Sequence, residues 1–294
     1  MMKLYSPAAV RQVLDKYEFV FQKRLGQNFL IDGNIINKIV DAASLDSEDT
    51  VLEIGAGIGA LTSALAVKAG KVVTIEIDKN LQPLLEETLS AYTNIDLFWG
   101  NAVKTDFDAL ISEKTQGQFG KNGRPYKVVA NLPYYITTPL LMHALENCFN
   151  ISLIILMVQK EVADRIAAVP GTKDYGALTL GVNYYSNPQK VFKVPRKVFI
   201  PQPDVESAVI RLILRKHPPA QVINEQAFFC VVKAAFGQRR KTLLNALSSL
   251  GIDKNQLSII LYDLGINPER RGETLSFEEF AGISNVLYPL ISKN

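Results

Sequence analysis

The chain has 294 residues, of which 48% are hydrophobic and 21% charged, and its formal net charge is +3. This composition is typical of a globular protein with one large and one smaller domain, and no apolar run approaches the roughly 20 residues that span a bilayer. Two cysteines and two histidines are too few for a disulfide framework or a histidine-rich metal site. We therefore expect a cytoplasmic protein without a metal site or a membrane segment, and we further expect a monomer.

Strand and helix patterns alternate through the first half of the chain. Residues 1–25 are expected to form an arm over the main domain, and a helix is predicted over 34–43. Helical patterns then separate strands that indicate a parallel, doubly wound sheet, predicted over 51–54, 72–77, 95–99, 127–130 and 153–158. A helix over 160–168 follows, and two apolar segments at 189–194 and 207–214 are expected to close the sheet as an antiparallel pair. The prediction is an α/β fold with seven strands.

The dipeptide Pro218-Pro219 marks a domain boundary, because two prolines cannot continue a strand. Beyond it the apolar spacing is helical, with helices predicted over 224–236, 238–250, 254–264 and 276–287. Ser276 and Glu279 have the spacing of a capping box at the start of the last helix. We expect a first domain over residues 1–217 and a small all-α domain over 218–294.

A glycine-rich turn follows the first predicted strand, in the sequence Glu53-Ile54-Gly55-Ala56-Gly57-Ile58-Gly59. Glycines let the backbone approach a ligand closely and adopt positive φ. The next strand ends near Glu76, where an acid can accept hydrogen bonds from ribose hydroxyls. Gly55, Gly57 and Ala60 also satisfy the dinucleotide pattern. The loop by itself therefore leaves a nicotinamide cofactor and a methyl donor both open.

The tetrapeptide Asn131-Leu132-Pro133-Tyr134 follows another predicted strand, at the edge where open α/β sheets bind their ligands. It supplies a side-chain amide, a backbone carbonyl made rigid by proline, and an aromatic ring. Two acceptors can hold the N–H groups of an exocyclic amine while the ring stacks on the base. Taken alone, the tetrapeptide is also an ordinary proline turn. Thr137-Thr138-Pro139 predicts the start of the next helix, with a hydroxyl cap.

Together these motifs resemble those of the bacterial small-subunit ribosomal RNA adenine N6,N6-dimethyltransferases, the kasugamycin-sensitivity methyltransferase family. The resemblance extends from about Tyr17 to Tyr288 and also includes Gln27-Asn28-Phe29-Leu30, Gly100-Asn101-Ala102, Phe199-Ile200-Pro201-Gln202-Pro203, Ser207-Ala208-Val209 and Gln238-Arg239-Arg240-Lys241-Thr242-Leu243. It implies a Rossmann-like class I methyltransferase with a seven-stranded, mostly parallel sheet and a small all-α C-terminal domain. It also implies transfer of methyl groups from S-adenosylmethionine to two adjacent adenosines near the 3′ end of 16S rRNA, in the small ribosomal subunit.

The resemblance assigns the catalytic role to the tetrapeptide, with hydrogen bonds from the adenine amine to Asn131 and to the Leu132 carbonyl, and stacking on Tyr134. It implies that the cofactor is bound by Gln27, Asn28, Leu30, Glu53, Gly55, Gly57, Glu76, Asn101 and Asn131. Position 101 departs from the family, which commonly has Asp there to accept from the cofactor's adenine. Asn101 keeps one carbonyl oxygen for that contact, and it is also an ordinary turn residue. From the residues alone, Asn28-Phe29-Leu30 is equally a turn with two core residues.

The RNA-binding role falls on Phe199, Arg239, Arg240 and Lys241. Phe199 is expected on the second face of the base, although a core residue fits the pattern as well. The three cations are predicted on a helix after Gly237, where they suit a phosphate backbone or form a solvated face. Residues 190–216 add a local cationic bias, with seven basic side chains against two acidic ones.

Three alternatives stay open. A 23S rRNA adenine dimethyltransferase of the macrolide-resistance type would share the catalytic chemistry, and only Leu132 and the 238–243 segment argue against it. A ribosome-assembly factor whose binding matters more than its catalysis would have the same sequence features. A nicotinamide-dependent dehydrogenase is allowed by the glycine spacing, but no acid or base suited to hydride transfer is visible.

Overall fold

The computed structural model describes residues 6–22, 25–238 and 240–291. Its contacts divide the chain into two compact units, Met1–Ala163 with Gln189–Leu214, and Asp164–Pro188 with Arg215–Asn294. The segment 164–188 thus groups with the C-terminal helices, whereas the sequence placed it before the boundary at 217. The reason is local packing, because Tyr184 in this segment lies 5.3 Å from the ring of Phe228. No helix in the described ranges is long and apolar enough to cross a membrane.

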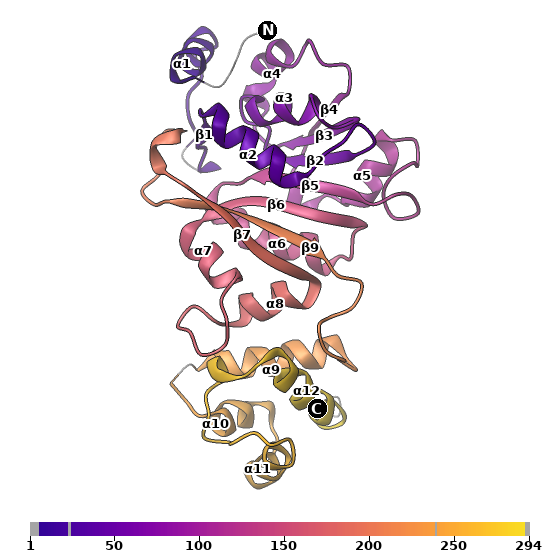
Figure 1. The fold of residues 1–294 in the computed structure, drawn as a ribbon, viewed down its shortest axis with the longest axis vertical. Helices are drawn as coiled ribbons and strands as arrows, with labels where there is room; N and C mark the ends of the chain where they lie inside the picture. The colour runs from indigo at the N-terminus through magenta and orange to yellow at the C-terminus, as the bar shows by residue number, and fades with distance from the viewer. Residues whose placement is uncertain (1–5, 23–24, 239, 292–294) are drawn as a thin grey trace. The chain divides into compact units, whose positions relative to one another are not determined.

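The first unit is built on a seven-stranded sheet with the order β4-β3-β2-β5-β6-β9-β7 (Figure 1). The neighbours from β4 to β6 pair in parallel, and β9 pairs antiparallel with β6. The strands are β2 Thr50–Ile54, β3 Lys71–Glu76, β4 Ile95–Trp99, β5 Tyr126–Asn131, β6 Ile151–Gln159, β7 Ser186–Val194 and β9 Ser207–Leu214. The predicted mostly parallel, seven-stranded sheet is confirmed.

The helices between these strands follow the predicted order. They are α2 Gly33–Ala43, α3 Ala60–Ala66, α4 Gln82–Thr88, α5 Phe107–Lys114, α6 Thr137–Glu146 and α7 Lys160–Ile166. A further helix, α1 Pro7–Lys16, lies in the segment predicted only as an arm. Its start has a local cause, because Ser6 accepts a hydrogen bond from the Ala9 N–H and Pro7 occupies the first turn.

Strand side chains alternate between the two faces of the sheet. Val51, Val129 and Ile155 are fully buried and belong to one core cluster with α2 and α3, while Leu52 on the other face is also fully buried. Each such side chain contributes roughly 1.5–3 kcal/mol when removed from water. Burial on both faces explains why the strands are continuous apolar runs in the sequence.

The order of the strands reverses between β2 and β5. From β2 the chain proceeds outward through β3 and β4, and it then returns to β5 on the other side of β2. Ile54 at the end of β2 lies opposite Ala130 near the end of β5. The loops after these two strands therefore diverge, which leaves a crevice at the carboxyl edge of the sheet.

A second, two-stranded sheet brings the N-terminal segment to this edge. It consists of β1 Phe29–Leu30 and β8 Phe199–Ile200, with Leu30 opposite Phe199. The N–H of Ile31 extends the pairing by donating to the Val198 carbonyl at 2.9 Å. The segment that precedes α2 is thereby fixed beside the crevice.

The second unit contains α8 Ala177–Tyr185, α9 Glu225–Gly237, α10 Leu243–Leu247, α11 Lys254–Asp263 and α12 Phe277–Ile291. The predicted capping box is present, since Ser276 and Glu279 exchange hydrogen bonds of 2.8 and 3.2 Å. The helix predicted over 238–250 is wrong in its first turn. Thr242 is extended, with φ −63° and ψ 157°, and it caps a helix that begins only at Leu243.

Candidate functional site

A cavity lies in the crevice between β2 and β5 and encloses about 1090 Å³, including open solvent at its mouth. Twelve of the residues predicted for the site line it, namely Gln27, Asn28, Leu30, Gly55, Gly57, Glu76, Asn101, Asn131, Leu132, Pro133, Tyr134 and Phe199. Of the described residues predicted for the site, Glu53, Arg240 and Lys241 do not line it.

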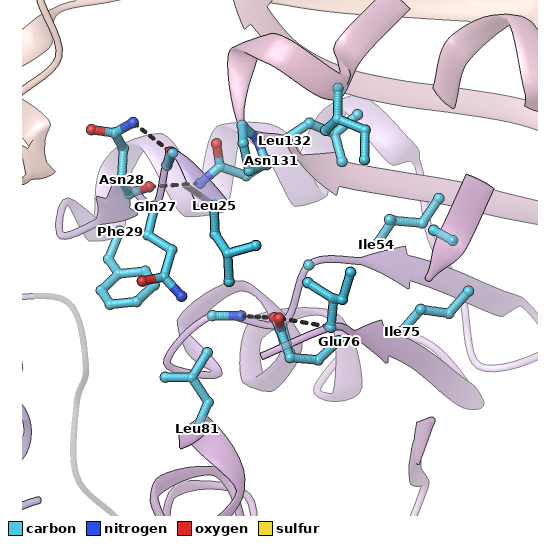
Figure 2. A pocket seen from close by; sticks show the side chains of 18 of the residues that line it. Leu25, Gln27, Asn28, Phe29, Ile54, Ile75, Glu76, Leu81, Asn131 and Leu132 are labelled. Carbon is cyan, nitrogen blue, oxygen red and sulfur yellow. Dashed lines mark hydrogen bonds between the residues drawn. The ribbon is translucent and has the colours of Figure 1, made fainter. Parts of the chain in front are cut away.

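The glycine turn and the acid after β3 are joined directly. The Gly57 N–H donates to the Glu76 Oε2 at 3.0 Å, and Figure 2 shows Glu76 on one side of the cavity. Gly57 has φ +54°, and a Cβ at this position would lie 3.2 Å from the ring of Phe29. A side chain here is therefore disfavoured by both backbone conformation and space.

Glu76 is buried and is held by main-chain donors. Its Oε1 accepts from the N–H groups of Ile77 and Asp78, each at 2.8 Å, in addition to the bond from Gly57 to Oε2. Burial raises the pKa of Glu76, and the three N–H groups oppose that rise. A carboxylate offers about four acceptor positions, so Oε2 has room for one further donor from the cavity. Three main-chain donors already occupy the carboxylate, so holding both ribose hydroxyls, as predicted from the sequence, needs one acceptor position to be shared.

Glu53 lies behind the glycine turn rather than in the cavity. It is completely buried, opposite Thr74 on β3. Burial raises the pKa of Glu53 to about 8, against the opposing effect of the Thr62 and Thr74 hydroxyls. The group is thus mostly neutral at pH 7. The prediction of a direct cofactor contact by Glu53 does not fit this position, because its side chain points into the interior of the unit.

Asn131 is the last residue of β5, and its amide orientation is set by the N-terminal segment. Its Nδ2 donates to the Asn28 carbonyl at 3.5 Å, as Figure 2 shows. In the described part of the chain, Oδ1 of Asn131 has no partner. The acceptor predicted from the sequence is therefore available. The Asn28 side chain turns back onto its own segment and donates to the Gly26 carbonyl at 2.9 Å.

Tyr134, the last residue of the tetrapeptide, begins a short helix, η4 Tyr134–Ile136, and Pro133 lies at its N-cap. Leu132 is buried, and Tyr134 is half-buried with its hydroxyl 2.8 Å from that of Ser207. Burial raises the pKa of Tyr134. The hydroxyl cap predicted for α6 is wrong, since Thr137 is the first helical residue and its hydroxyl donates to the Pro133 carbonyl at 3.3 Å.

Phe199 and Asn101 each combine a structural role with a place at the cavity. Phe199 is only 4% exposed, so it is mainly a core residue of the cavity wall. Asn101 caps the short helix η3 Ala102–Lys104, where its Oδ1 accepts from the Val103 N–H at 3.1 Å. That oxygen keeps a second lone pair.

Arg240 and Lys241 are exposed in the second unit, within the turn between α9 and α10 rather than on a helix. The Lys241 N–H closes this turn by donating to the Gln238 carbonyl at 2.9 Å. Arg239 lies outside the described residues.

Sequence reasoning missed three residues at or behind the cavity. Tyr135 lines it and is 59% exposed, and the doubled tyrosine was the available signal. Asp78 and Ser207 hold cavity residues from behind, through contacts across 51 and 73 positions of the chain. No local pattern marks such contacts. Among the described residues, no group of three His, Cys, Asp or Glu side chains is placed to hold a metal ion.

A parallel sheet with this strand order, and a cavity that joins a glycine turn to an amide and a tyrosine, are features of a Rossmann-like methyltransferase. A crystal structure of a dimethyladenosine transferase from Plasmodium falciparum has the same fold, with a TM-score of 0.74 and 26% identity, covering 89% of this chain and 98% of that one. The 23S rRNA methyltransferase ErmE gives a TM-score of 0.66 at 26% identity, covering 88% and 99%.

Sequence similarity over the whole chain identifies the family within this class of methyltransferases. The family model for "Ribosomal RNA adenine dimethylase" matches residues 18–288. The "Ribosomal RNA small subunit methyltransferase A" of Pelotomaculum thermopropionicum is 52% identical over 287 residues, which cover 97% of each chain. The protein of the same name from Geobacillus kaustophilus is 50% identical over 292 residues, covering 98% of each. This chain belongs to the ribosomal RNA adenine dimethylase family, and it is an rRNA-modifying methyltransferase.

Proposed function

We propose that the chain uses S-adenosylmethionine to methylate N6 of two adjacent adenosines near the 3′ end of 16S rRNA, giving N6,N6-dimethyladenosine during biogenesis of the small ribosomal subunit in the cytoplasm. The observation that carries this is that Asn131, Tyr134, the glycine turn and Glu76 all line one cavity. The small-subunit substrate is supported by relatives named "Ribosomal RNA small subunit methyltransferase A", which are 50–52% identical over nearly the whole chain.

The cavity residues fit S-adenosylmethionine. Glu76 offers Oε2 to a ribose hydroxyl, and Asn101 offers the second lone pair of its Oδ1 to an adenine amine. Gly55 and Gly57 have no side chains, so the backbone of the turn can approach the ligand closely. Gln27, Asn28 and Leu30 also line the cavity. When bound, the cofactor would supply an electrophilic methyl group.

The tetrapeptide would orient the adenine amine. The lone pair of the amine nitrogen is delocalised into the adenine ring, so the amine is a poor nucleophile. Hydrogen bonds from its two N–H groups to Asn131 Oδ1 and to the Leu132 carbonyl favour a pyramidal nitrogen. Such orientation and electrostatic stabilisation supply most of the rate. No strong base is needed, because the methylated nitrogen is acidic and loses its proton to solvent.

The target base must leave its stack to reach this cavity. Tyr134 is the proposed platform, and stacking on an aromatic ring contributes about 1–3 kcal/mol per base. Phe199 supports the opposite wall. Arg239, Arg240 and Lys241 would contact the phosphate backbone of the RNA, and residues 218–294 would form the RNA-binding domain around them.

The decisive experiment offers unmethylated small and large ribosomal subunits separately, with labelled S-adenosylmethionine, and identifies the labelled nucleosides after digestion. We expect labelled dimethyladenosine from small subunits only. Label in large subunits alone would favour the macrolide-resistance type, and no label in adenine would refute the proposal.

A Glu76→Ala variant separates catalysis from binding. We expect it to lose methylation while it keeps its affinity for small subunits, because Glu76 lies on the cofactor side of the cavity. Activity that survives the substitution would argue against the cofactor site. Loss of subunit binding together with methylation would mean that the assembly role and the catalytic role cannot be separated in this way.

A further inference from the structure

Asp78 is a buried carboxylate beside the cavity that has no part in the mechanism above. It is 3% exposed and lies two residues after Glu76. Its Oδ2 accepts from Gln27 Nε2 at 2.6 Å, and its Oδ1 accepts from Gln22 Nε2 at 2.9 Å. Both glutamines belong to the segment that connects α1 to β1. Hydrogen bonds to an ionised acceptor are about twice as strong as neutral ones.

Neither partner of the shortest bond is free to turn. The Oε1 of Gln27 accepts from the Gln22 N–H at 2.9 Å, which fixes the side-chain amide at both ends. Asp78 caps the short helix η2 Lys79–Leu81, where its Oδ1 also accepts from the Asn80 N–H at 3.1 Å. The contact is therefore a defined anchor rather than one of many surface arrangements.

The same segment contacts the opposite side of the cavity. A Cβ on Gly26 would lie 3.4 Å from the Cβ of Pro133, so the backbone packs directly on the tetrapeptide. The Asn28 carbonyl accepts from Asn131 Nδ2 at 3.5 Å. Figure 2 shows Leu25 and Gln27 projecting into the space between Asn131 and Glu76. Residues 25–28 thus cross the cavity from the cofactor side to the side of the base.

We propose that Asp78 is a positioning residue that anchors Gln22 and residues 25–28 across the cavity, and that it couples the conformational order of these residues to cofactor binding. The coupling has a direct path, because the Asp78 N–H donates to the Glu76 Oε1 at 2.8 Å. A ligand that binds Glu76 therefore also affects Asp78, which anchors the segment. The inference rests on the proposed cofactor site.

An Asp78→Asn substitution removes the anchor with almost no change of shape. If the new amide keeps its oxygen toward Gln27, its NH₂ group faces the N–H of Asn80 and the Nε2 of Gln22. If it turns over, its NH₂ group faces the Nε2 of Gln27. Each orientation sets donor against donor, and leaving a buried donor without a partner costs about 1–3 kcal/mol. Asp96→Asn is the control, because Asp96 lies on the neighbouring strand β4 and pairs with Lys71 away from the cavity.

The experiment measures hydrogen exchange in peptides covering residues 19–30, with and without S-adenosylhomocysteine, together with the steady-state constants for S-adenosylmethionine. For Asp78→Asn we expect faster exchange in these peptides and a KM about tenfold higher, with kcat changed less than threefold. Asp96→Asn is expected to match the wild type in all three measurements. A double-mutant cycle with Gln27→Ala is expected to be non-additive, because both substitutions break one contact.

Two results would overturn the inference. One is unchanged exchange and unchanged KM in Asp78→Asn. The other is a loss of protection throughout the first unit, since that would mark an ordinary stabilising residue. The exchange of the free protein does not depend on catalysis, so it tests the anchor even if the proposed rRNA methylation is not observed.

Discussion

The hydroxyl oxygens of Tyr134 and Ser207 lie 2.8 Å apart, which joins the tetrapeptide after β5 to strand β9. Ser207 is completely buried and lies opposite Gln159 of β6, so its position is fixed by the sheet. The bond fixes the outer end of the Tyr134 ring and therefore the direction in which the side chain points. In the proposed mechanism the ring is thereby positioned before the base arrives.

Ser207→Ala is expected to lower kcat about fivefold, because a net hydrogen bond contributes about 1 kcal/mol and this one holds the stacking ring. Tyr134→Phe should cause a similar loss, and the double variant should lose no more than either alone. Methylation rates at saturating S-adenosylmethionine measure this. Ser152→Ala is a matched control, since the Ser152 hydroxyl donates to the Tyr126 carbonyl at the opposite end of β6. Additive losses would contradict the role assigned to the pair.

The buried acid Glu53 predicts an unusual dependence of stability on pH. Its pKa of about 8 in the folded state exceeds the ordinary value of 4.5. The folded state therefore keeps a proton that the unfolded state releases, and this contribution to stability falls as pH rises from about 4.5 to 8. The full effect is about 5 kcal/mol.

Glu53→Gln mimics the neutral acid and should remove this dependence. We expect the difference between the unfolding free energies at pH 5 and pH 8 to be smaller in the variant than in the wild type by a few kcal/mol. Urea unfolding at the two pH values measures it. Equal pH dependence in both proteins would show that Glu53 is ionised in the folded state.

The fold was predictable where the signals are local. The parallel strands are continuous apolar runs, and the glycine turn and the tetrapeptide each lie within a few residues of a strand end. The sequence could not show which residues of these motifs are buried in the interior and which line the cavity. Glu53 belongs to the same motif as Gly55, but it lies within β2, where every residue is buried, whereas Gly55 lies after the end of the strand.

Long-range contacts account for most of the remaining differences. Asp78 and Ser207 act through partners far away in the chain, which only the folded structure brings together. The turn at Arg240 and Lys241 had a local signal in Thr242, whose capping of α10 outweighed the helical apolar spacing.

Gly57→Ala should weaken cofactor binding for a reason of backbone shape. The left-handed conformation costs a non-glycine residue about 1–2 kcal/mol, and the added Cβ also meets Phe29 at 3.2 Å. Gly117→Ala is the matched control, because Gly117 has φ +81° and nothing within 4 Å of the new Cβ. Both variants should lose stability, but only Gly57→Ala should bind S-adenosylhomocysteine at least tenfold more weakly by calorimetry. Equal affinities would place the ligand away from the turn.

Arg240→Ala with Lys241→Ala should reduce RNA binding through charge alone. Each phosphate contact that is lost lowers the dependence of log K on log salt by about 0.7 to 0.9. We expect weaker binding to small subunits, a shallower salt dependence, and unchanged affinity for S-adenosylhomocysteine. Lys233→Ala is the control, because it removes another exposed cation, on α9 rather than in the turn. An unchanged salt slope in the double variant would remove the turn from the RNA-contacting surface.

Asn131→Asp tests the amide itself, since it keeps the size of the side chain and one acceptor. The carboxylate cannot donate to the Asn28 carbonyl, which now lies at 3.5 Å from Nδ2, and it places a negative charge beside that oxygen. We expect kcat to fall at least a hundredfold, as when an oriented transition-state contact is removed, and the KM for S-adenosylmethionine to rise less than tenfold. Single-turnover methylation of small subunits measures the chemical step. If the rate constant of that step were unchanged, the methyl acceptor would be held by a different group, and the alignment of Asn131 by the N-terminal segment would have no catalytic purpose.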